Sequence, residues 1–377
     1  MKRILPALLA AVLLLTVPVS AISAPEVSAP SVLLMEKTTG TILCQQDAHT
    51  QYEPASVTKV MTLLLTFEAL SEGLITLDQV VTVSAYATSM GGSQIWLKEN
   101  EQITVDELIK AVAVVSANDC AVALAELIAG SESAFVERMN ERATELGMTK
   151  TSFQNCTGLP AAGHVTTAHD IALMSRELVL HHPDIRKYTT IWMDTLRDGA
   201  FQLSNTNKLI RFYDGATGLK TGFTDSALYC LSATAERDGM ELIAVVMHAP
   251  TSNDRFESAK ALLSYGFANY ALLSIQPQQV LPPVDVILGK CNAVQPILAE
   301  YPTVLLEKAQ AGKVEQSITL ADCVEAPVEA GQKLGELTVT VDGQTVASIP
   351  LVTAEPVERL TLGGIFLRLF NTLLCGV

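Results

Sequence analysis

Residues 56–59 read Ser-Val-Thr-Lys and lead directly into the apolar run VMTLLLTFEAL at residues 60–70. No glycine or proline interrupts the chain before Gly73, so the run predicts a buried central helix. Side chains three positions apart lie on one face of a helix. The Lys59 amine can then reach the hydroxyl of Ser56, which sits at the helix N-terminus, where the dipole and free N–H groups favour developing negative charge.

A second motif, Ser-Ala-Asn at residues 116–118, lies between two helical runs at 105–115 and 119–128. It therefore predicts a turn between two helices. Taken alone, a pattern this short is commonplace, and so is a serine three residues before a lysine.

A third motif, Lys-Thr-Gly at residues 220–222, precedes residues 229–235, which alternate like a strand. A turn at 236–239 leads to a second strand at 242–247. The sequence therefore predicts a β-hairpin with the Lys-Thr-Gly motif at its leading edge.

The three motifs in this order are typical of acyl transfer by a serine that lysine activates, as in enzymes that act on D-alanyl peptides or bind β-lactams. Serine is a weak nucleophile until a base activates it. Lys59 can serve as that base only when neutral, so burial or a nearby cation must lower its pKa. Lys220 is the candidate for that cation.

From about residue 30 to its C-terminus, the chain resembles the low-molecular-weight penicillin-binding proteins, the serine-type D-alanyl-D-alanine carboxypeptidases. Beyond the motifs, the resemblance rests on GLKTGFT at 218–224, NDRFE at 253–257, AHDIAL at 168–173, LGEL at 334–337 and VDG at 341–343. It implies an α+β fold, with a penicillin-binding, serine β-lactamase-like transpeptidase domain in which helices cover both sides of an antiparallel sheet. A small, mainly-β domain is expected to follow.

The resemblance also implies catalytic roles. Ser56 would attack the carbonyl between the two terminal D-alanines of a peptidoglycan stem peptide and form an acyl-enzyme, and penicillin would be trapped at the same serine. Lys59 would accept the hydroxyl proton, and Ser116 would relay a proton towards the leaving amine. Asn118 would hold the substrate amide.

The Lys-Thr-Gly strand would bind the substrate's carboxyl end through Lys220, Thr221 and Gly222. Thr221 and Arg255 would hold the terminal carboxylate, and Lys220 would add positive charge. The backbone N–H groups of Ser56 and Phe223 would form the oxyanion hole. Some relatives carry histidine where this chain has Phe223, so only a backbone role is carried over. Ala117 stands where relatives have glycine or aspartate, and a side chain this small should be harmless.

Composition predicts the domain boundaries. Residues 30–273 are expected to form the catalytic domain, closed by a helix at 259–273, and prolines break the pattern at 276–283. Residues 284–353 carry short alternating segments, and Asp342-Gly343 predicts a tight hairpin turn. Residues 360–377 predict an amphipathic helix that lies in a membrane interface. The alternatives are a final helix docked on the β domain and a dimer contact.

The N-terminus has the features of an export signal. A basic start, an uncharged apolar stretch and small residues before position 22 predict a signal peptide at 1–21, with 24 as a second cleavage point. We therefore expect the chain on the outer face of the cytoplasmic membrane, in the cell wall space. Its net charge of −15 argues against a nucleic-acid partner.

The sequence shows no metal-binding motif and does not assign disulfide bonds. The six histidines show no zinc-binding spacing, so no metal or cofactor is expected. The seven cysteines contain no C-x-x-C pair, and their odd number leaves at least one unpaired in a monomer. Spacing does not assign disulfides among them.

Two other functions compete with the carboxypeptidase. A class A-like β-lactamase shares the motifs but needs a glutamate for deacylation, and residues 150–165 contain no Asp or Glu. A catalytically weak peptidoglycan- or penicillin-binding protein would keep the fold without turnover, and the intact motifs count against it. The sequence leaves open whether water or an amine accepts the acyl group, the identity of the third stem residue and the cellular role.

Overall fold

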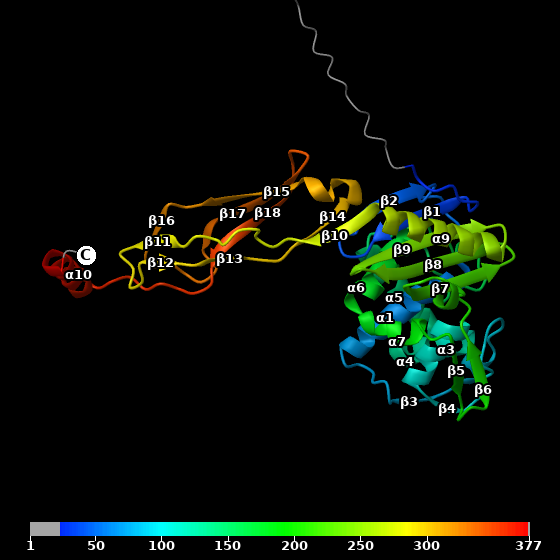
Figure 1. Ribbon diagram of the computed structural model, residues 1–377. Helices are drawn as coiled ribbons and strands as arrows, with labels where there is room; N and C mark the ends of the chain where they lie inside the picture. The colour runs from blue at the N-terminus through cyan, green and yellow to red at the C-terminus, as the bar shows by residue number, and fades with distance from the viewer. Residues whose placement is uncertain (1–22, 376–377) are drawn as a thin grey trace, which may run out of the picture.

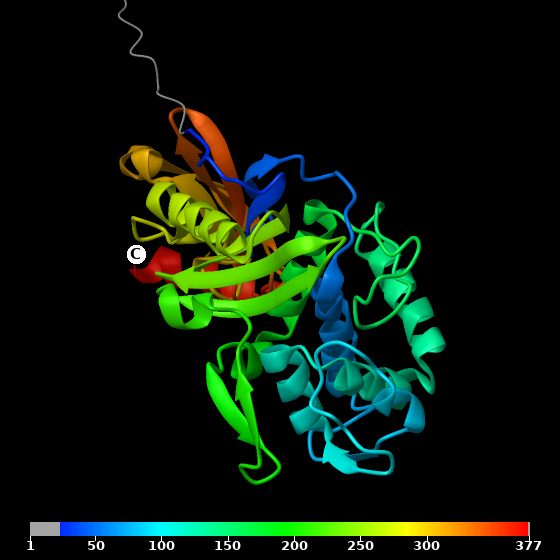
Figure 2. The ribbon, with the colours of Figure 1, turned by 90° about the vertical axis from the view of Figure 1, so that its right-hand side faces the viewer.

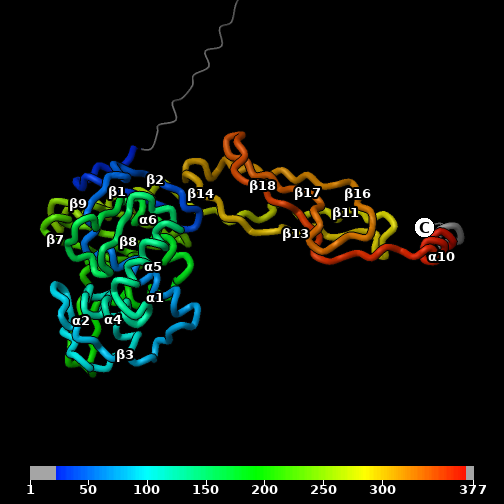
Figure 3. The backbone as a smooth tube through the Cα atoms, turned by 180° about the vertical axis from the view of Figure 1, so that it is seen from behind, coloured from blue at the N-terminus to red at the C-terminus, as the bar shows by residue number. Residues whose placement is uncertain are grey.

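The computed structural model describes residues 23–375, with side chains up to residue 370. The signal peptide expected at residues 1–21 lies outside the described residues. Figures 1 and 3 show an elongated molecule. Helices and a sheet form a broad part at one end, a narrower β part follows, and helix α10 lies at the far tip.

A five-stranded antiparallel sheet organises the broad part, in the order β2-β1-β9-β8-β7. Its strands in that order are Ile42–Gln46, Ser31–Glu36, Met240–Ala249, Leu228–Arg237 and Ala216–Thr224. The hairpin predicted around residue 238 is therefore present as β8 and β9. The Lys-Thr-Gly motif, expected at the leading edge of this hairpin, lies within a strand of its own, the edge strand β7, which pairs with β8.

The sheet separates two hydrophobic cores because successive strand residues point to opposite faces. On β9, Ile243 and Val245 pack with helix α1, whereas Leu242 and Ala244 pack with helix α9 on the other face. Figure 2 shows α9 in yellow-green and α1 in blue on opposite sides of the sheet. The expected antiparallel sheet with helices on both sides is confirmed.

Longer helices fill the α1 side. They are α1 (Lys59–Ser71), α3 (Val105–Val115), α4 (Asn118–Ala129), α5 (Glu132–Glu145) and α6 (Ala168–His181), while α9 spans Ser252–Asn269. Shorter helical segments are η1 (Ala55–Thr58), α2 (Ala85–Thr88), η2 (Pro183–Ile185), α7 (Arg186–Thr189) and α8 (Leu209–Phe212). The small hairpins are β3 (Val80–Thr82) with β4 (Gln102–Thr104), and β5 (Met193–Leu196) with β6 (Phe201–Ser204).

Helix α1 is buried along most of its length, as its sequence predicts. Every residue from Lys59 to Phe67 is buried, and the apolar side chains of this run belong to the main core. The 3-10 turn η1 precedes the helix and carries Ser56. The hydrophobic run therefore anchors the candidate nucleophile at the rim of the core.

The helix expected at 259–273 is wrong at both ends. Helix α9 starts at Ser252 and ends at Asn269, and Tyr270–Ser274 forms strand β10. This strand pairs with β14 (Thr303–Glu307), some thirty residues further along. Because that partner is distant in sequence, helical periodicity at 259–269 gives no warning of the change.

The narrow part contains two further sheets. One has the order β13-β18-β17-β15 and the other β12-β11-β16. Their strands are β11 (Val284–Ile287), β12 (Ala293–Val294), β13 (Pro296–Leu298), β15 (Val314–Leu320), β16 (Cys323–Glu325), β17 (Lys333–Val341) and β18 (Gln344–Thr353), with the 3-10 segment η3 at Lys308–Lys313. Asp342 and Gly343 join β17 to β18 with positive φ values of 49° and 77°. The predicted hairpin turn is confirmed.

Helix α10 (Leu362–Cys375) ends the described chain. Its apolar side chains are mostly in solvent, with Leu362 87% and Phe366 71% exposed. No described helix is long and apolar enough to cross a membrane. The six cysteines whose side chains are described are unpaired thiols.

Candidate active site

The structure brings Ser56 and Lys59 into contact. Lys59 Nζ donates to Ser56 Oγ at 3.0 Å and to the carbonyl oxygen of Thr157 at 2.6 Å. Ala55, one residue before the serine, adopts a left-handed φ of 47°. Non-glycine residues rarely adopt this conformation and often mark functional sites when they do. The strained turn thus presents the serine to the lysine.

Burial makes Lys59 a base. The side chain is 0% exposed, and loss of solvation lowers the pKa of Lys59 to about 7. The lowered pKa was expected, but Lys220 is not its cause. Repulsion from Lys59 instead adds to burial in lowering the pKa of Lys220 well below its ordinary range.

The Ser-Ala-Asn motif forms the predicted turn between α3 and α4. Ser116 ends α3 in a left-handed conformation with φ 67°. Its Oγ is buried and has no hydrogen-bond partner, and neither has the Oδ1 atom of Asn118. Buried polar atoms are normally paired, so these two are available to a ligand.

The rest of the Asn118 side chain is fixed in place. Its Nδ2 donates to the carbonyl oxygen of Gly91 at 2.7 Å. The Asn118 backbone N–H donates to the carbonyl of Ser93, also at 2.7 Å. Asp119 lies close enough to Lys59 for its charge to raise the lysine pKa against the effect of burial. The start of α4 is therefore adjacent to the Ser56–Lys59 pair.

Strand β7 presents the third motif on the sheet edge. Lys220 is 1% exposed, and its Nζ donates to the carbonyl oxygen of Thr221 at 2.9 Å. The Thr221 hydroxyl donates to Thr206 Oγ1 at 2.7 Å. Thr206 is a candidate site residue that the sequence did not indicate, because no motif surrounds it.

Gly222 allows β7 to run directly against the nucleophile turn. A Cβ at this position would lie 2.8 Å from the carbonyl oxygen of Pro54 and 3.1 Å from the backbone nitrogen of Ser56. The next residue, Phe223, has a half-exposed side chain whose ring lies 4.4 Å from that of Tyr229. Its backbone role in an oxyanion hole stays a prediction.

Arg255 supports β7 from the start of α9. Its Nη1 donates to the carbonyl oxygens of Gly222 at 3.1 Å and Cys230 at 3.4 Å, and the side chain is 7% exposed. Burial lowers the pKa of Arg255 to about 10. Its Nε has no hydrogen-bond partner. Arg255 therefore places positive charge beside Thr221 while holding the strand.

Residues 150–165 also contact the Ser56–Lys59 segment, which the short motifs did not indicate. Besides Thr157, this segment supplies His164, whose Nε2 lies 2.8 Å from Thr58 Oγ1. The Thr58 hydroxyl donates to the carbonyl of Ala55, and the N–H of Gln154 donates to His164 Nδ1. These partners require a neutral imidazole protonated at Nε2, in keeping with burial lowering the pKa of His164 to about 4.

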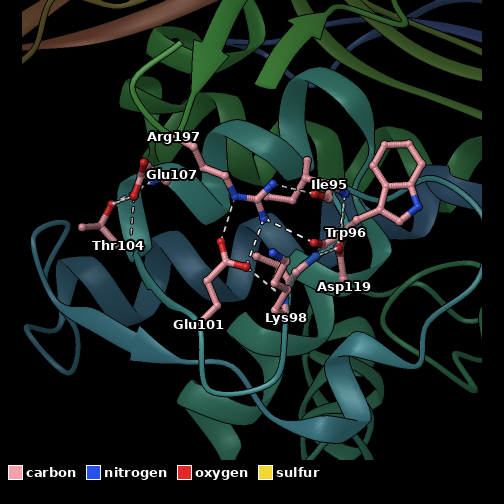
Figure 4. Close-up of polar contacts among 9 residues, drawn as sticks. Ile95, Trp96, Lys98, Glu101, Thr104, Glu107, Asp119 and Arg197 are labelled. Atoms are coloured by element: carbon pink, nitrogen blue, oxygen red, sulfur yellow. Dashed lines mark hydrogen bonds and ion pairs between the residues drawn. The ribbon is translucent and has the colours of Figure 1, made fainter. Parts of the chain in front are cut away.

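A polar cluster fixes the loop that contacts Asn118 (Figure 4). Asp119 accepts hydrogen bonds from the backbone N–H groups of Ile95 and Leu97. Arg197 donates to the carbonyl of Ile95 at 2.9 Å and binds the carboxylate of Glu101 at 2.8 Å. The loop is thereby tied both to α4 and to the β5–β6 hairpin.

No cluster of three or more His, Cys, Asp or Glu side chains arranged to hold a metal occurs within the described part of the chain. The candidate machinery consists of the hydroxyls of Ser56, Ser116 and Thr221, the buried amines of Lys59 and Lys220, the Asn118 amide, the Arg255 guanidinium and several backbone groups. A buried, neutral lysine beside a partly buried serine can activate that serine for attack on a carbonyl carbon.

Comparison with known proteins matches both parts of the molecule. The family described as D-alanyl-D-alanine carboxypeptidase matches residues 19–251. The family described as penicillin-binding protein 5, C-terminal domain, matches residues 275–359. A D-alanyl-D-alanine carboxypeptidase of Bacillus subtilis (strain 168), DacF, is 39% identical over 372 residues, which are 95% of this chain and 95% of the relative.

Solved structures agree. Penicillin-binding protein 5 from Haemophilus influenzae superposes with a TM-score of 0.76 at 30% identity, covering 90% of this chain and 100% of that one. Penicillin-binding protein D2 from Listeria monocytogenes, in its ampicillin-bound form, gives a TM-score of 0.59 at 33% identity, covering 64% of this chain and 98% of that one.

Proposed function

The chain belongs to the D-alanyl-D-alanine carboxypeptidase family, and from that premise we propose how its residues carry out the reaction. It is a serine-type carboxypeptidase that removes the terminal D-alanine from peptidoglycan stem pentapeptides. The observation that carries the assignment of residues is the contact between Ser56 and a fully buried Lys59, whose pKa is lowered to about 7.

Acylation begins when neutral Lys59 takes the proton of Ser56. The Ser56 oxygen then attacks the carbonyl carbon between the two terminal D-alanines. As the carbon–nitrogen bond breaks, the leaving amine receives a proton through Ser116, whose unpartnered Oγ is free to relay it. D-Alanine departs, and the stem tetrapeptide remains esterified to Ser56. Water then attacks the ester and releases the tetrapeptide.

The edge strand β7 and the start of α4 bind the substrate. The unpartnered Oδ1 of Asn118 accepts a hydrogen bond from the substrate amide. Thr221 and Arg255 bind the terminal carboxylate, whose negative charge favours the protonated form of Lys220, so that Lys220 adds positive charge once the substrate is bound. The backbone N–H groups of Ser56 and Phe223 stabilise the oxyanion, each worth about 2.7–4 kcal/mol of barrier. The close approach of Gly222 to Ser56 supports this pairing.

Covalent labelling with a fluorescent penicillin tests the nucleophile. We expect the wild type to be labelled, Ser56→Ala to be unlabelled, and the matched control Ser133→Ala, at an exposed serine, to label normally. Label that survives Ser56→Ala would contradict the assignment. Release of D-alanine from a D-Ala-D-Ala peptide separates this enzyme from a β-lactamase, which would hydrolyse the drug and spare the peptide.

The acceptor is tested separately. A defined pentapeptide is incubated with the enzyme, with and without an amine acceptor, and the products are separated by mass. We expect free tetrapeptide to dominate in both reactions. A transfer product that exceeds the tetrapeptide would identify a transpeptidase instead.

We also propose that the mature protein is exported and held at the outer face of the cytoplasmic membrane by α10. The exposed Leu362, Phe366 and Phe370 support this role, because such side chains partition into a lipid interface. Co-sedimentation with anionic vesicles should fall at least tenfold in Phe366→Asp and stay unchanged in Val346→Asp, at an exposed residue of β18. Equal binding of both variants would contradict the proposal, and N-terminal sequencing of secreted protein tests cleavage after residue 21.

A further inference from the structure

The backbone around Trp96 fixes its side chain in a solvent-exposed position. Its side chain is 64% exposed, whereas its neighbours Ile95 and Leu97 are 0% and 5% exposed. Trp96 also adopts a left-handed φ of 54°, which is uncommon for a bulky residue and costs about 1–3 kcal/mol. The chain thus tolerates strain to turn a large apolar ring outward.

Four backbone contacts fix this geometry. The N–H groups on either side of Trp96 donate to the buried carboxylate of Asp119, and the carbonyl oxygens of Ile95 and Trp96 accept from Arg197. Figure 4 shows the indole pointing away from this polar cluster. The backbone that carries the exposed ring is therefore held on both sides.

A second ring supports the first. Phe201, at the start of β6, meets Trp96 edge-to-face with 5.8 Å between ring centres. The guanidinium of Arg197 lies 5.8 Å from the centre of the Phe201 ring. We call Trp96, Phe201 and Arg197 the aromatic shelf. A fixed, exposed aromatic surface is the kind of feature that marks a binding site.

The loop that carries the shelf also contacts Asn118. The backbone N–H of Asn118 donates to the carbonyl of Ser93, and Trp96 lies three positions after Ser93, a span of at most about 11 Å. A stem tetrapeptide, fully extended, reaches about 14 Å from its scissile carbonyl to the sugar that carries it. A substrate whose scissile carbonyl lies near Asn118 is therefore long enough for its sugar to reach Trp96.

We propose that the aromatic shelf binds a pyranose ring of the peptidoglycan glycan to which the stem peptide is attached. The C–H face of the sugar stacks on the flat indole of Trp96. The hydroxyl groups of the sugar bond to the guanidinium of Arg197. This inference rests on the proposed carboxypeptidase function, since the sugar is the other end of the same substrate. A purely apolar partner would leave the guanidinium of Arg197, whose side chain is 31% exposed, unmatched.

Tryptophan fluorescence tests sugar binding without turnover. The chain has two tryptophans, Trp96 and Trp192, so Trp192→Phe in a Ser56→Ala background leaves Trp96 as the sole reporter. We expect its emission to shift saturably with N-acetylglucosaminyl-N-acetylmuramic acid and not with cellobiose. No shift at tens of millimolar disaccharide would overturn the proposal. A shift with free stem peptide alone would overturn it in favour of a peptide subsite.

Kinetics test the consequence for catalysis. On a disaccharide-pentapeptide, Trp96→Ala should lower kcat/KM about three- to tenfold more than it does on the free pentapeptide, with Trp96→Phe in between. Tyr301→Ala, at a ring 69% exposed in the narrow β part, should change neither value. Equal losses on both substrates would overturn the shelf assignment. If no variant or wild type released D-alanine, the carboxypeptidase function would fail, while a fluorescence response to the disaccharide would still support the shelf.

Discussion

Replacing Lys59 with methionine should make the protein more stable at low pH while abolishing its activity. Burial lowers the pKa of Lys59 from 10.5 to about 7. Between these two values the unfolded chain binds a proton that the folded chain does not, so stability rises with pH through this window. Below this pH window, folding must either deprotonate Lys59 or bury its positive charge.

The size of the effect follows from the shift. The destabilisation due to Lys59 is about 5 kcal/mol at pH 6 and falls to about 2 kcal/mol at pH 9. Methionine keeps an unbranched apolar chain but leaves the carbonyl of Thr157 without its donor, which costs about 1–3 kcal/mol. We therefore expect Lys59→Met to be more stable than the wild type by about 2–4 kcal/mol at pH 6 and nearly equal to it at pH 9. Relief of repulsion on Lys220 acts in the same direction.

Urea unfolding of the chain without its signal peptide, at pH 6, 7.5 and 9, measures this difference. Comparing variant with wild type at each pH cancels the titration of groups shared by both. Lys150→Met, at an exposed lysine, controls for the loss of one positive charge and should show no pH-dependent difference. If the gap between Lys59→Met and wild type stayed constant with pH, or had the opposite sign at pH 6, burial would not be what makes Lys59 a base.

Three further outcomes are expected. Acylation by a β-lactam should rise about tenfold per pH unit below the Lys59 pKa of about 7 and level off above it, since only the neutral amine accepts the serine proton; a flat stopped-flow profile from pH 5 to 9 would refute this. Gly158→Ala would place a Cβ 1.8 Å from the carbonyl oxygen of Ala55 at a φ of +82°, so thermal unfolding should report a loss of about 3 kcal/mol or more, together with weaker penicillin labelling; an unchanged melting temperature would show that the turn can move. Thr206→Val removes the acceptor that orients the Thr221 hydroxyl, so peptide KM should rise about tenfold with little change in kcat; an unaltered KM would remove Thr206 from the site.

Local patterns account for the elements that the sequence predicted well. The apolar run after Ser56 forms α1 because its apolar side chains need burial together. The turn at 116–118 lies where one helical run ends and the next begins. Asp342-Gly343 forms its hairpin because both residues accept a positive φ. Each of these predictions depends on neighbours within a few positions.

The bounds of the edge strand β7 could not be predicted in this way. It holds Gly218, Lys220 and Gly222, which lower its strand propensity and break the apolar alternation. Lys220 is buried with its amine bonded to the carbonyl of Thr221, and Gly222 is small because η1 approaches it. Strand β10 escaped prediction for a different reason, since its partner β14 lies far along the chain.

Site residues that act through backbone atoms leave no motif either. Thr157 contributes only its carbonyl to Lys59, and any residue type supplies a carbonyl. His164 is a plain histidine in sequence, and its role in fixing Thr58 depends on a contact across 106 positions. Such residues become visible only when the fold sets them beside the nucleophile.

The need for a neutral base explains why Lys59 donates to the carbonyl of Thr157 and forms no ion pair with a carboxylate. An adjacent carboxylate would raise the pKa of Lys59 and keep it protonated. A carboxylate is nearby, on Asp119, but it is occupied by the backbone N–H groups of Ile95, Leu97 and Cys120. Within residues 23–375, no ion pair engages Lys59. The loop that carries Trp96 therefore also serves the base, because its amide N–H groups bond to the Asp119 carboxylate and partly offset the negative charge that raises the pKa of Lys59. Substitutions that release this loop from Asp119 should consequently raise the pH at which acylation levels off, even though none of them touches the serine.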